Sequence, residues 1–428
     1  MTDEIPLDPL DILFYYKQRG PYSTLIDVEG EVHFDLLEDA CRKAVELYPT
    51  GKMLIKIPPK FSFQKFKFYD PQSNNNYVNV HDHPFDKNKI KDTVVDMAKQ
   101  PGVNINVFKE DENKYKFFMF CHHSAGDAVA AFGFLKTMID EYNKNFGLKP
   151  LLQFQYKRFD PKELIELGKV TKEDKKIEMK TQFNKKSVKI HCPQNIKTNE
   201  IRDFDKKFDV KTSKRMLDYA KPNGKITDTL VAILAKTIDD HNFINGRINK
   251  QNIYISTPAN IRPEEKRFVG DGNYLSNATI EIPYLNRDNI NEMIVDIAEQ
   301  RNNPEYNPYI TYAVMDSFVN TIIKYTPQFI RPYIFKSNMV KSKDTALISN
   351  VPIPFDFVGE LYGTEFKDIK MDPSALNDFP INIISYSYKG ELRVRMNFRA
   401  SDFSHQHAKD FFDQYFRNLD SIMNKPVE

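Results

Sequence analysis

One short segment constrains the fold and the chemistry of this chain more than any other. Residues 117–121 are the apolar run Phe-Phe-Met-Phe-Cys, and His122-His123-Ser124-Ala125-Gly126-Asp127 follows directly. From Asp127 to Tyr142 apolar residues recur at the spacing of one helix face. The sequence therefore predicts an apolar strand that turns at once into an amphipathic helix capped by Asp127. A His at such a strand end is well placed to act as a general base, because imidazole exchanges a proton near neutral pH.

Apolar periodicity predicts the other elements of the chain. Helices are expected over 34–48, 90–99 and 228–240, with Thr227 as the cap of the last, and another helix follows residue 402. Strands are expected over 53–57, 61–68, 104–108, 114–121, 252–257, 381–388 and 392–398. Residues 104–121 and 381–398 are each predicted to form a hairpin, one in either half of the chain.

The C-terminal hairpin leads into a segment that parallels the first one. The strand over 392–398 runs into Arg399-Ala400-Ser401-Asp402, and an amphipathic helix follows. The Asp before the helix is kept, and both histidines are missing. We interpret the chain as one architectural unit used twice, with chemistry kept in the first copy. The alternative is a chance likeness, because a strand, a turn and a helix with an Asp cap are common.

The chain has 428 residues, which favours two domains. The predicted division is an N-terminal half over 1–170, a connecting segment over 171–200 and a C-terminal half over 201–428. Ten Lys fall within 161–200, which has few aromatic residues and no clean period. We therefore expect this part of the chain to be partly ordered at best.

Composition excludes several classes of function. The formal net charge is only +2, so there is no electrostatic reason to expect binding to nucleic acid or to an anionic membrane. No stretch is long enough for a membrane-spanning helix, and the N-terminus lacks the features of a signal peptide, so we expect a cytoplasmic protein. The glycine patterns of phosphate-binding loops and of dinucleotide-binding folds are absent, which argues against nucleotide hydrolysis and NAD chemistry.

The sequence does not favour a metal site or a disulfide framework. His81 and His83, like His405 and His407, have H-x-H spacing, but two ligands do not make a site and no third ligand pattern accompanies them. The three cysteines are odd in number and form no CxxC pair. Cys121 belongs to an apolar run and is interpreted as a core residue rather than a nucleophile.

Together these segments resemble the HHxxxD acyltransferase superfamily, which includes chloramphenicol acetyltransferases, condensation domains and alcohol acyltransferases. Residues 28–32 and the helix over 34–48 are similar to the family's opening unit. Residues 254–262, with Gly270 and Asn273, are similar to its "vPvNlR…GN" region, and 347–351 to its "SN" segment. Ala128 stands where the family usually has Gly. The resemblance extends from about residue 25 to residue 420.

The resemblance implies a fold and a set of site residues. The fold would be α/β, with two chloramphenicol acetyltransferase-like sandwich domains, mixed sheets and a tunnel between them. His123 would be the general base. Asp127 would form an ion pair with Arg262 of the other half, and this pair, His122 and Gly126 would shape the loop. Ser349 and Asn350 are candidates for lining the tunnel, where a donor could stabilise an oxyanion.

The resemblance also implies a reaction. An acyl group would move from a thioester, most simply acyl-CoA, to a small alcohol or amine without an acyl-enzyme. The thioester of CoA or of phosphopantetheine would be a co-substrate, and no bound cofactor is expected. Two alternatives stay open. One is a stand-alone condensation-type enzyme that uses a carrier protein in trans, and the other is a degenerate member that binds a ligand or acts as a scaffold.

Overall fold

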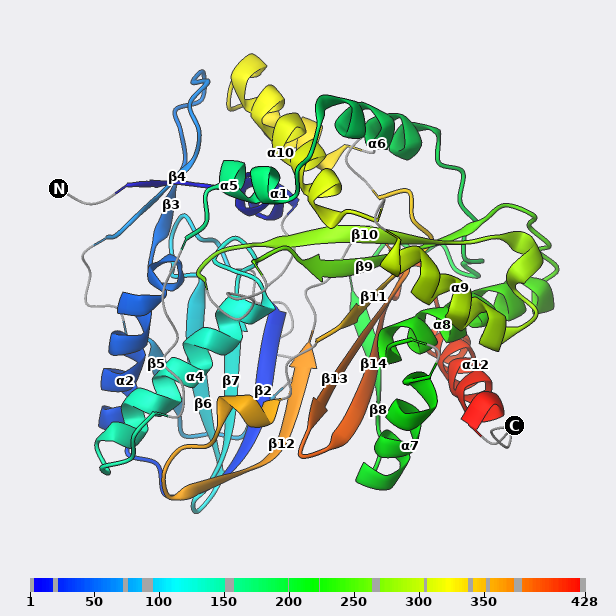
Figure 1. The fold of residues 1–428 in the computed structure, drawn as a ribbon. Helices are drawn as coiled ribbons and strands as arrows, with labels where there is room; N and C mark the ends of the chain where they lie inside the picture. The colour runs from blue at the N-terminus through cyan, green and yellow to red at the C-terminus, as the bar shows by residue number, and fades with distance from the viewer. Residues whose placement is uncertain are drawn as a thin grey trace.

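The structure of the chain is a computed structural model that describes residues 4–17, 22–71, 76–86, 95–150, 158–198, 200–222, 224–263, 270–303, 306–337, 342–351, 355–372 and 379–423. These residues form three β-sheets, with helices on the outer faces of the two larger ones (Figure 1). None of the described helices is both long and apolar enough to cross a membrane.

A five-stranded mixed sheet organises the N-terminal half, in the order β12-β2-β7-β6-β5. Its strands are β2 (Tyr22–Gly30), β5 (Val78–His81), β6 (Val103–Asp111), β7 (Lys114–Cys121) and β12 (Thr364–Asp372). Helices α2 (Phe34–Leu47) and α4 (Ala128–Lys144) cover one face (Figure 1), because each carries the apolar stripe that its periodicity predicts. A small sheet of β1 (Ile5–Pro6), β4 (Lys67–Tyr69) and β3 (Leu54–Lys56) lies beside it, and the 3-10 turn η1 (Pro49–Gly51) follows α2.

Gly133 lies in the middle of α4, where glycine lowers helix stability by about 1 kcal/mol relative to Ala. A Cβ at this position would lie 2.7 Å from Cζ of the buried Tyr48. Gly133→Ala is therefore expected to destabilise the protein by about 1–3 kcal/mol, because overpacking outweighs the gain in helix propensity. Urea denaturation measures this change. In a Tyr48→Leu background the ring is gone, so the same substitution should cost little, and an equal cost in both backgrounds would contradict the packing argument.

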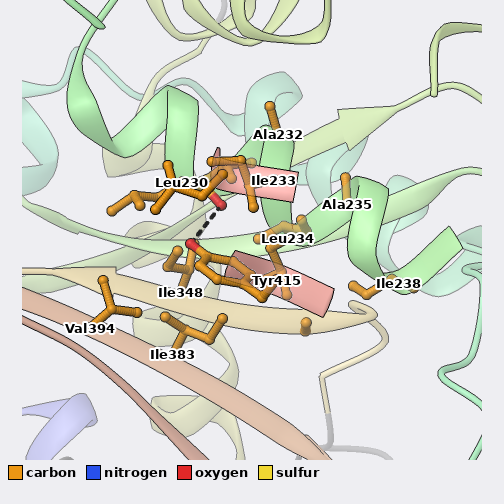
Figure 2. Packing of buried hydrophobic residues seen from close by; sticks show 14 of the residues in the cluster. Leu230, Ala232, Ile233, Leu234, Ala235, Ile238, Ile348, Ile383, Val394 and Tyr415 are labelled. Atoms are coloured by element: carbon orange, nitrogen blue, oxygen red, sulfur yellow. Dashed lines mark hydrogen bonds between the residues drawn. The ribbon is translucent and has the colours of Figure 1, made fainter. Parts of the chain in front are cut away.

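A six-stranded mixed sheet organises the C-terminal half, in the order β10-β9-β11-β13-β14-β8. Its strands are β8 (Ile201–Lys207), β9 (Ile253–Asn260), β10 (Leu275–Ile282), β11 (Ala346–Asn350), β13 (Ile381–Tyr388) and β14 (Glu391–Arg399). The neighbouring helices are α7 (Val210–Ala220), α8 (Ile226–Ile244), α9 (Ile290–Asn302) and α12 (His405–Met423). Figure 2 shows the core between α8, α12 and the sheet, where the Tyr415 hydroxyl donates to the Leu230 carbonyl at 3.3 Å.

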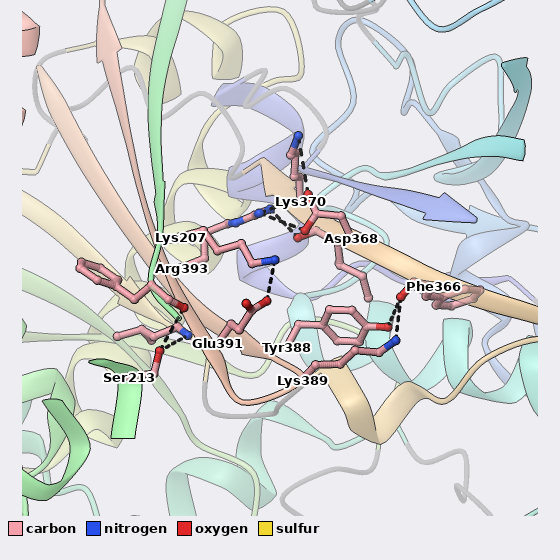
Figure 3. Close-up of polar contacts among 12 residues, drawn as sticks. Lys207, Ser213, Phe366, Asp368, Lys370, Tyr388, Lys389, Glu391 and Arg393 are labelled. Atoms are coloured by element: carbon pink, nitrogen blue, oxygen red, sulfur yellow. Dashed lines mark hydrogen bonds and ion pairs between the residues drawn. The ribbon is translucent and has the colours of Figure 1, made fainter. Parts of the chain in front are cut away.

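Strand β12 joins the two halves. It comes from the C-terminal part of the chain, yet it pairs antiparallel with β2 over Gly30–Thr364 to Ser23–Asp372. Side chains of β13 and β14 reach it from the other sheet (Figure 3). Arg393 donates to the Ile369 carbonyl at 2.8 Å and to the Asp368 carboxylate at 3.0 Å, and the Tyr388 hydroxyl donates to the Phe366 carbonyl at 2.7 Å. The two sheets are therefore held together by buried polar contacts as well as by chain connection.

The expectation of a poorly ordered connection over 161–200 is wrong for much of that segment. It contains α5 (Pro161–Leu167) and α6 (Lys172–Asn184), and α6 begins with a capping box in which Thr171 and Asp174 satisfy each other's backbone N–H groups. Both helices contact α10 (Pro308–Tyr325). Helix α1 (Pro9–Lys17) packs against α10 and also against α11 (Arg331–Lys336). The lysines of α6 are mostly exposed, which explains why no apolar period marks it.

Other predicted elements differ in detail. The strand expected over 61–68 is limited to β4, since residues 62–66 are irregular. Of the helix expected over 90–99, residues 90–94 lie outside the described residues, and 95–99 contain a turn rather than a helix. Helix α8 begins at Ile226, so Thr227 is inside it rather than at its cap. The carboxylate of Asp402 accepts from Arg399, while the Ser404 hydroxyl accepts from the backbone of α12. The two strand–turn–helix segments therefore begin their helices differently. Two further 3-10 turns of the described residues are η3 (Tyr284–Asn286) and η5 (Phe355–Val358).

Candidate active site

His123 lies two residues beyond the end of β7, the middle strand of the N-terminal sheet. Its imidazole is held between two aromatic rings. The Phe14 ring of α1 stacks on it at 4.3 Å between centroids and 16° between planes, and the Tyr22 ring of β2 lies 4.8 Å away at 57°. Both aromatic residues are buried, whereas His123 is partly exposed. No sequence pattern predicted Phe14 or Tyr22 as site residues, because each reaches the site from a distant part of the chain.

His122 points into the protein and has a structural role. It is buried, and its Nδ1 accepts the Ser124 backbone N–H at 3.0 Å. This bond requires an unprotonated Nδ1 and so fixes the tautomer with hydrogen on Nε2. Burial lowers the pKa of His122 to about 4, against a small opposing effect of Asp96. His122 therefore stays neutral, and its hydrogen bond to Ser124 stabilises the loop next to His123.

The neutral His122 predicts an acid-dependent loss of stability. Its pKa is lower in the folded state than the ordinary 6.5, so its stabilising contribution is present above pH 6.5 and is lost as the pH falls toward 4. A tenfold change in proton affinity corresponds to about 1.4 kcal/mol, so the full loss is about 3 kcal/mol. Urea denaturation across this pH range should show a flatter profile for His122→Asn than for the wild type.

The exposed His405 provides the control for this experiment. Burial raises the pKa of Asp8, and it raises the pKa of Asp271 to about 6. Their protonation acts in the opposite direction over the same pH range, but it is common to all variants. His405→Asn should therefore keep the wild-type profile, and identical profiles for the His122 and His405 variants would contradict the assignment.

Asp127 is the most heavily bonded side chain of the loop. As predicted, it caps α4, accepting from the backbone N–H of Val129 at 3.0 Å and of Ala130 at 3.1 Å. It also accepts from the Tyr274 N–H at 2.9 Å. The ion pair expected with Arg262 is present and bidentate, with N–O distances of 2.8 and 3.0 Å, and both side chains are fully buried. The pair joins the start of α4 to the segment after β9.

Gly126 is required by a close approach rather than by its backbone conformation. A Cβ there would lie 2.7 Å from Cβ of Ala130 in the first turn of α4. Ala128 stands where the superfamily that the sequence resembles usually has Gly. It is the first residue of α4 and packs, partly buried, against the N-terminal core. Its methyl group is accommodated by the helix start.

A second layer of buried polar residues surrounds the loop. Nδ2 of Asn273 donates to the His123 carbonyl and, at 2.9 Å, to Oδ1 of Asp11. The Ser124 hydroxyl donates to the Asp11 carbonyl at 2.8 Å. Nη2 of Arg158 donates to Asp11 at 2.7 Å and to Asp8 at 2.8 Å. The loop is thus hydrogen-bonded to α1 and to the C-terminal half. Of its partners outside the loop, only Asn273 belonged to a motif in the sequence.

Ser349 and Asn350 lie at the end of β11, and the Asn350 side chain contacts α8 and β13. The Asn350 amide donates to the Thr227 hydroxyl at 3.1 Å, and its Oδ1 accepts from Ser385 at 2.8 Å. Within the described part of the chain, neither residue forms a hydrogen bond to the loop, so their place along a tunnel stays a prediction. A cavity of about 280 Å³ opens beside β5 and β6, lined mainly by amide side chains, His81 and Phe120. The tunnel itself also stays a prediction.

The other residues considered from the sequence have ordinary contacts. Cys121 is buried in the core, and burial raises its pKa to about 12, which disfavours the thiolate. His81 bonds to Asn106 and stacks on Phe108, and His407 bonds to Ser404. Among the described residues no three His, Cys, Asp or Glu side chains are grouped as metal ligands.

No family model matches the sequence, and no curated protein matches it. Solved structures match its fold. The epimerization domain from the third module of tyrocidine synthetase B aligns with a TM-score of 0.72 at 14% identity, covering 99% of this chain and 96% of that one. Trichothecene 15-O-acetyltransferase from Fusarium sporotrichioides aligns with a TM-score of 0.72 at 9% identity, covering 98% and 95%. The condensation domain of the Monacolin K polyketide synthase gives 0.72 at 10% identity, covering 99% and 98%.

This chain has the condensation-domain fold. The matches extend over nearly the whole length of both partners, so the two-lobed chloramphenicol acetyltransferase-like arrangement predicted from the sequence is confirmed. In this fold the two lobes of the present chain meet where Asp127 and Arg262 pair, next to His123. The identities are low, so the likeness concerns the architecture.

Proposed function

We propose that this chain is an acyltransferase that moves an acyl group from a thioester to the hydroxyl or amine of a small acceptor, with His123 as the general base. The observation that carries the proposal is the placement of His123. Its ring is fixed between Phe14 and Tyr22, on a loop that is bonded to both halves of a condensation-domain fold. A fixed imidazole at the meeting point of two lobes suits a base that acts on a substrate bound between them.

The proposed step needs no acyl-enzyme. A ring nitrogen of His123 takes the acceptor's proton while the acceptor oxygen or nitrogen attacks the thioester carbonyl carbon. A C–O or C–N bond forms, the C–S bond breaks, and the proton passes to the departing thiolate. The products are an ester or amide and a free thiol. Cys121 is buried and not poised to be a nucleophile, which supports direct transfer.

Asp127, Arg262, His122 and Gly126 shape the loop in this proposal and do not touch the substrate. All four residues are buried. The hydrogen bonds and the ion pair of the Asp127, Arg262 and His122 side chains are made with other groups of the protein. An ion pair buried in this way adds little net stability, so its value would lie in the geometry that it enforces.

Acyl-CoA is the favoured donor, with CoA thioester as a co-substrate. A carrier protein acting in trans is the alternative, because condensation domains share the fold. A condensation domain of the calcium-dependent antibiotic synthetase, solved with a substrate analogue, aligns with a TM-score of 0.70 at 11% identity. A non-catalytic binding or scaffold role is the third possibility.

Thiol release separates these possibilities. The wild type and His123→Ala are incubated with acyl-CoA esters of increasing chain length and a panel of alcohols and amines, and free thiol is measured. The proposal predicts acceptor-dependent release by the wild type alone. Release only from phosphopantetheinyl thioesters on a carrier protein would favour the condensation-type alternative. Equal release by both proteins, or none with either donor, would reject the proposed function.

A further inference from the structure

From the contacts of helix α1 we infer that Asp11 and Asn273 are positioning residues for His123. Phe14 fixes the orientation of the His123 imidazole by stacking on it. This inference rests on the proposed function, in which His123 is the base, and extends it to a segment in which the sequence showed no motif. The three residues come from distant parts of the sequence, since Phe14 and Asp11 belong to α1 and Asn273 precedes β10.

Asn273 is oriented by its two partners. The His123 carbonyl and the Asp11 carboxylate both accept hydrogen bonds, so the side of the amide that faces them must be the NH₂ group. Its two hydrogens allow both bonds at once. Asn273 is fully buried, so water cannot readily replace either bond. The amide therefore fixes the peptide plane that follows His123, and with it the direction from which the imidazole leaves the backbone.

Asp11 transmits the position of α1 to the loop through two groups. Its Oδ1 accepts a hydrogen bond from the Asn273 amide, and its backbone carbonyl accepts one from the Ser124 hydroxyl at 2.8 Å. Its Oδ2 is in turn held by Nη2 of Arg158 at 2.7 Å and by the Asp8 N–H at 3.1 Å. The carboxylate is fully buried, and all of these bonds have ordinary hydrogen-bond lengths of 2.7 to 3.1 Å. A displacement of α1 would consequently move the residues on either side of the His123–Ser124 peptide.

Phe14 completes the arrangement three residues further along α1. Its ring covers one face of the imidazole in a near-parallel stack, and Tyr22 covers another side. Rotation of the imidazole would open a gap against both rings, which costs contact energy in a packed site. Helix α1 thus fixes the backbone of His123 through Asp11 and Asn273, and its side chain through Phe14.

The test compares Asn273→Ala with Asn418→Ala. Asn418 is a matched control because it is also a buried asparagine whose Nδ2 donates to two oxygens, at 3.1 Å each, but it lies on α12. Steady-state kinetics of thiol release and NMR of histidine-labelled protein are recorded for both, with the His123 signal assigned from its absence in His123→Ala. Misplacement of a reacting group by about 1 Å can cost about 100-fold in rate, so kcat of Asn273→Ala should fall by about 10- to 100-fold with little change in KM.

The NMR readout keeps the inference separate from the proposed function. The His123 signal should shift or broaden in Asn273→Ala and stay unchanged in Asn418→Ala. A perturbed signal in a protein without thioester activity would support the positioning role and reject the proposed function. Equal behaviour of the two asparagine variants in kinetics and NMR would overturn the inference. Should Asn273→Ala fail to fold, Phe14→Leu decides, because it removes the stack and leaves the polar bonds intact; an unchanged His123 signal there would overturn the inference.

Discussion

Asp127→Ala is expected to lower the free energy of unfolding by about 3–5 kcal/mol, which is the usual cost of removing one partner of a buried ion pair. The substitution leaves the guanidinium of Arg262 buried against a methyl group. It also removes the acceptor for the N–H groups of Val129, Ala130 and Tyr274. The measurement is urea denaturation followed by circular dichroism, with the midpoint and slope fitted together.

Two further variants test whether the buried charge is the cause. Asp402→Ala is the matched control, because Asp402 pairs with Arg399 at the corresponding place in the second half, and both of those side chains are partly exposed. Such a pair should contribute less than about 1 kcal/mol. In Asp127→Ala with Arg262→Met no charge is left alone, so the double variant should lose less stability than the sum of the single variants. Strict additivity would contradict the proposed origin of the effect.

His123→Ala is expected to lower the rate of acyl transfer by about 10²- to 10⁴-fold, the range typical of a lost general base. The unfolding free energy should change far less than in Asp127→Ala, because His123 is partly exposed and no buried charge is left behind. The two variants therefore separate loss of chemistry from loss of structure. The rate is measured as thiol release at saturating acceptor, with the best donor from the panel.

His405→Ala is the control for this measurement, since His405 is exposed at the start of α12. Its rate should match the wild type. A His123→Ala protein that is folded and within about threefold of the wild-type rate would remove His123 from the general-base role, since such a base contributes at least about 10²-fold.

Local sequence patterns predicted those parts of the fold that local physics determines. The hairpin over 104–121 and the helix after Asp127 follow from periods of two and 3.6 residues, and the Asp127 cap follows from its place before an apolar run. The start of helix α6 has a recognisable capping box in Thr171 and Asp174, but its exposed lysines leave no apolar period that would predict the rest of the helix.

Contacts between distant segments could not be predicted in the same way. Arg262 was identified through a family resemblance and not through any spacing in the chain. Asp11, Phe14 and Tyr22 lie about a hundred residues before His123, in segments without a motif, and only the folded chain brings them together. The pairing of β12 with β2 is equally invisible, because no periodicity specifies which strand a neighbour will be.

The pairing of β12 with β2 has a consequence for the folding of this protein during synthesis. Gly30 and its partner Thr364 are 334 positions apart in the sequence, so β2 lacks its outer neighbour until most of the chain has been synthesised. An unpaired strand edge can bind other chains, and pairing over such a separation is slow. The β2 edge of the N-terminal lobe therefore stays open to aggregation during translation until residues 364–372 have left the ribosome and paired with it as β12.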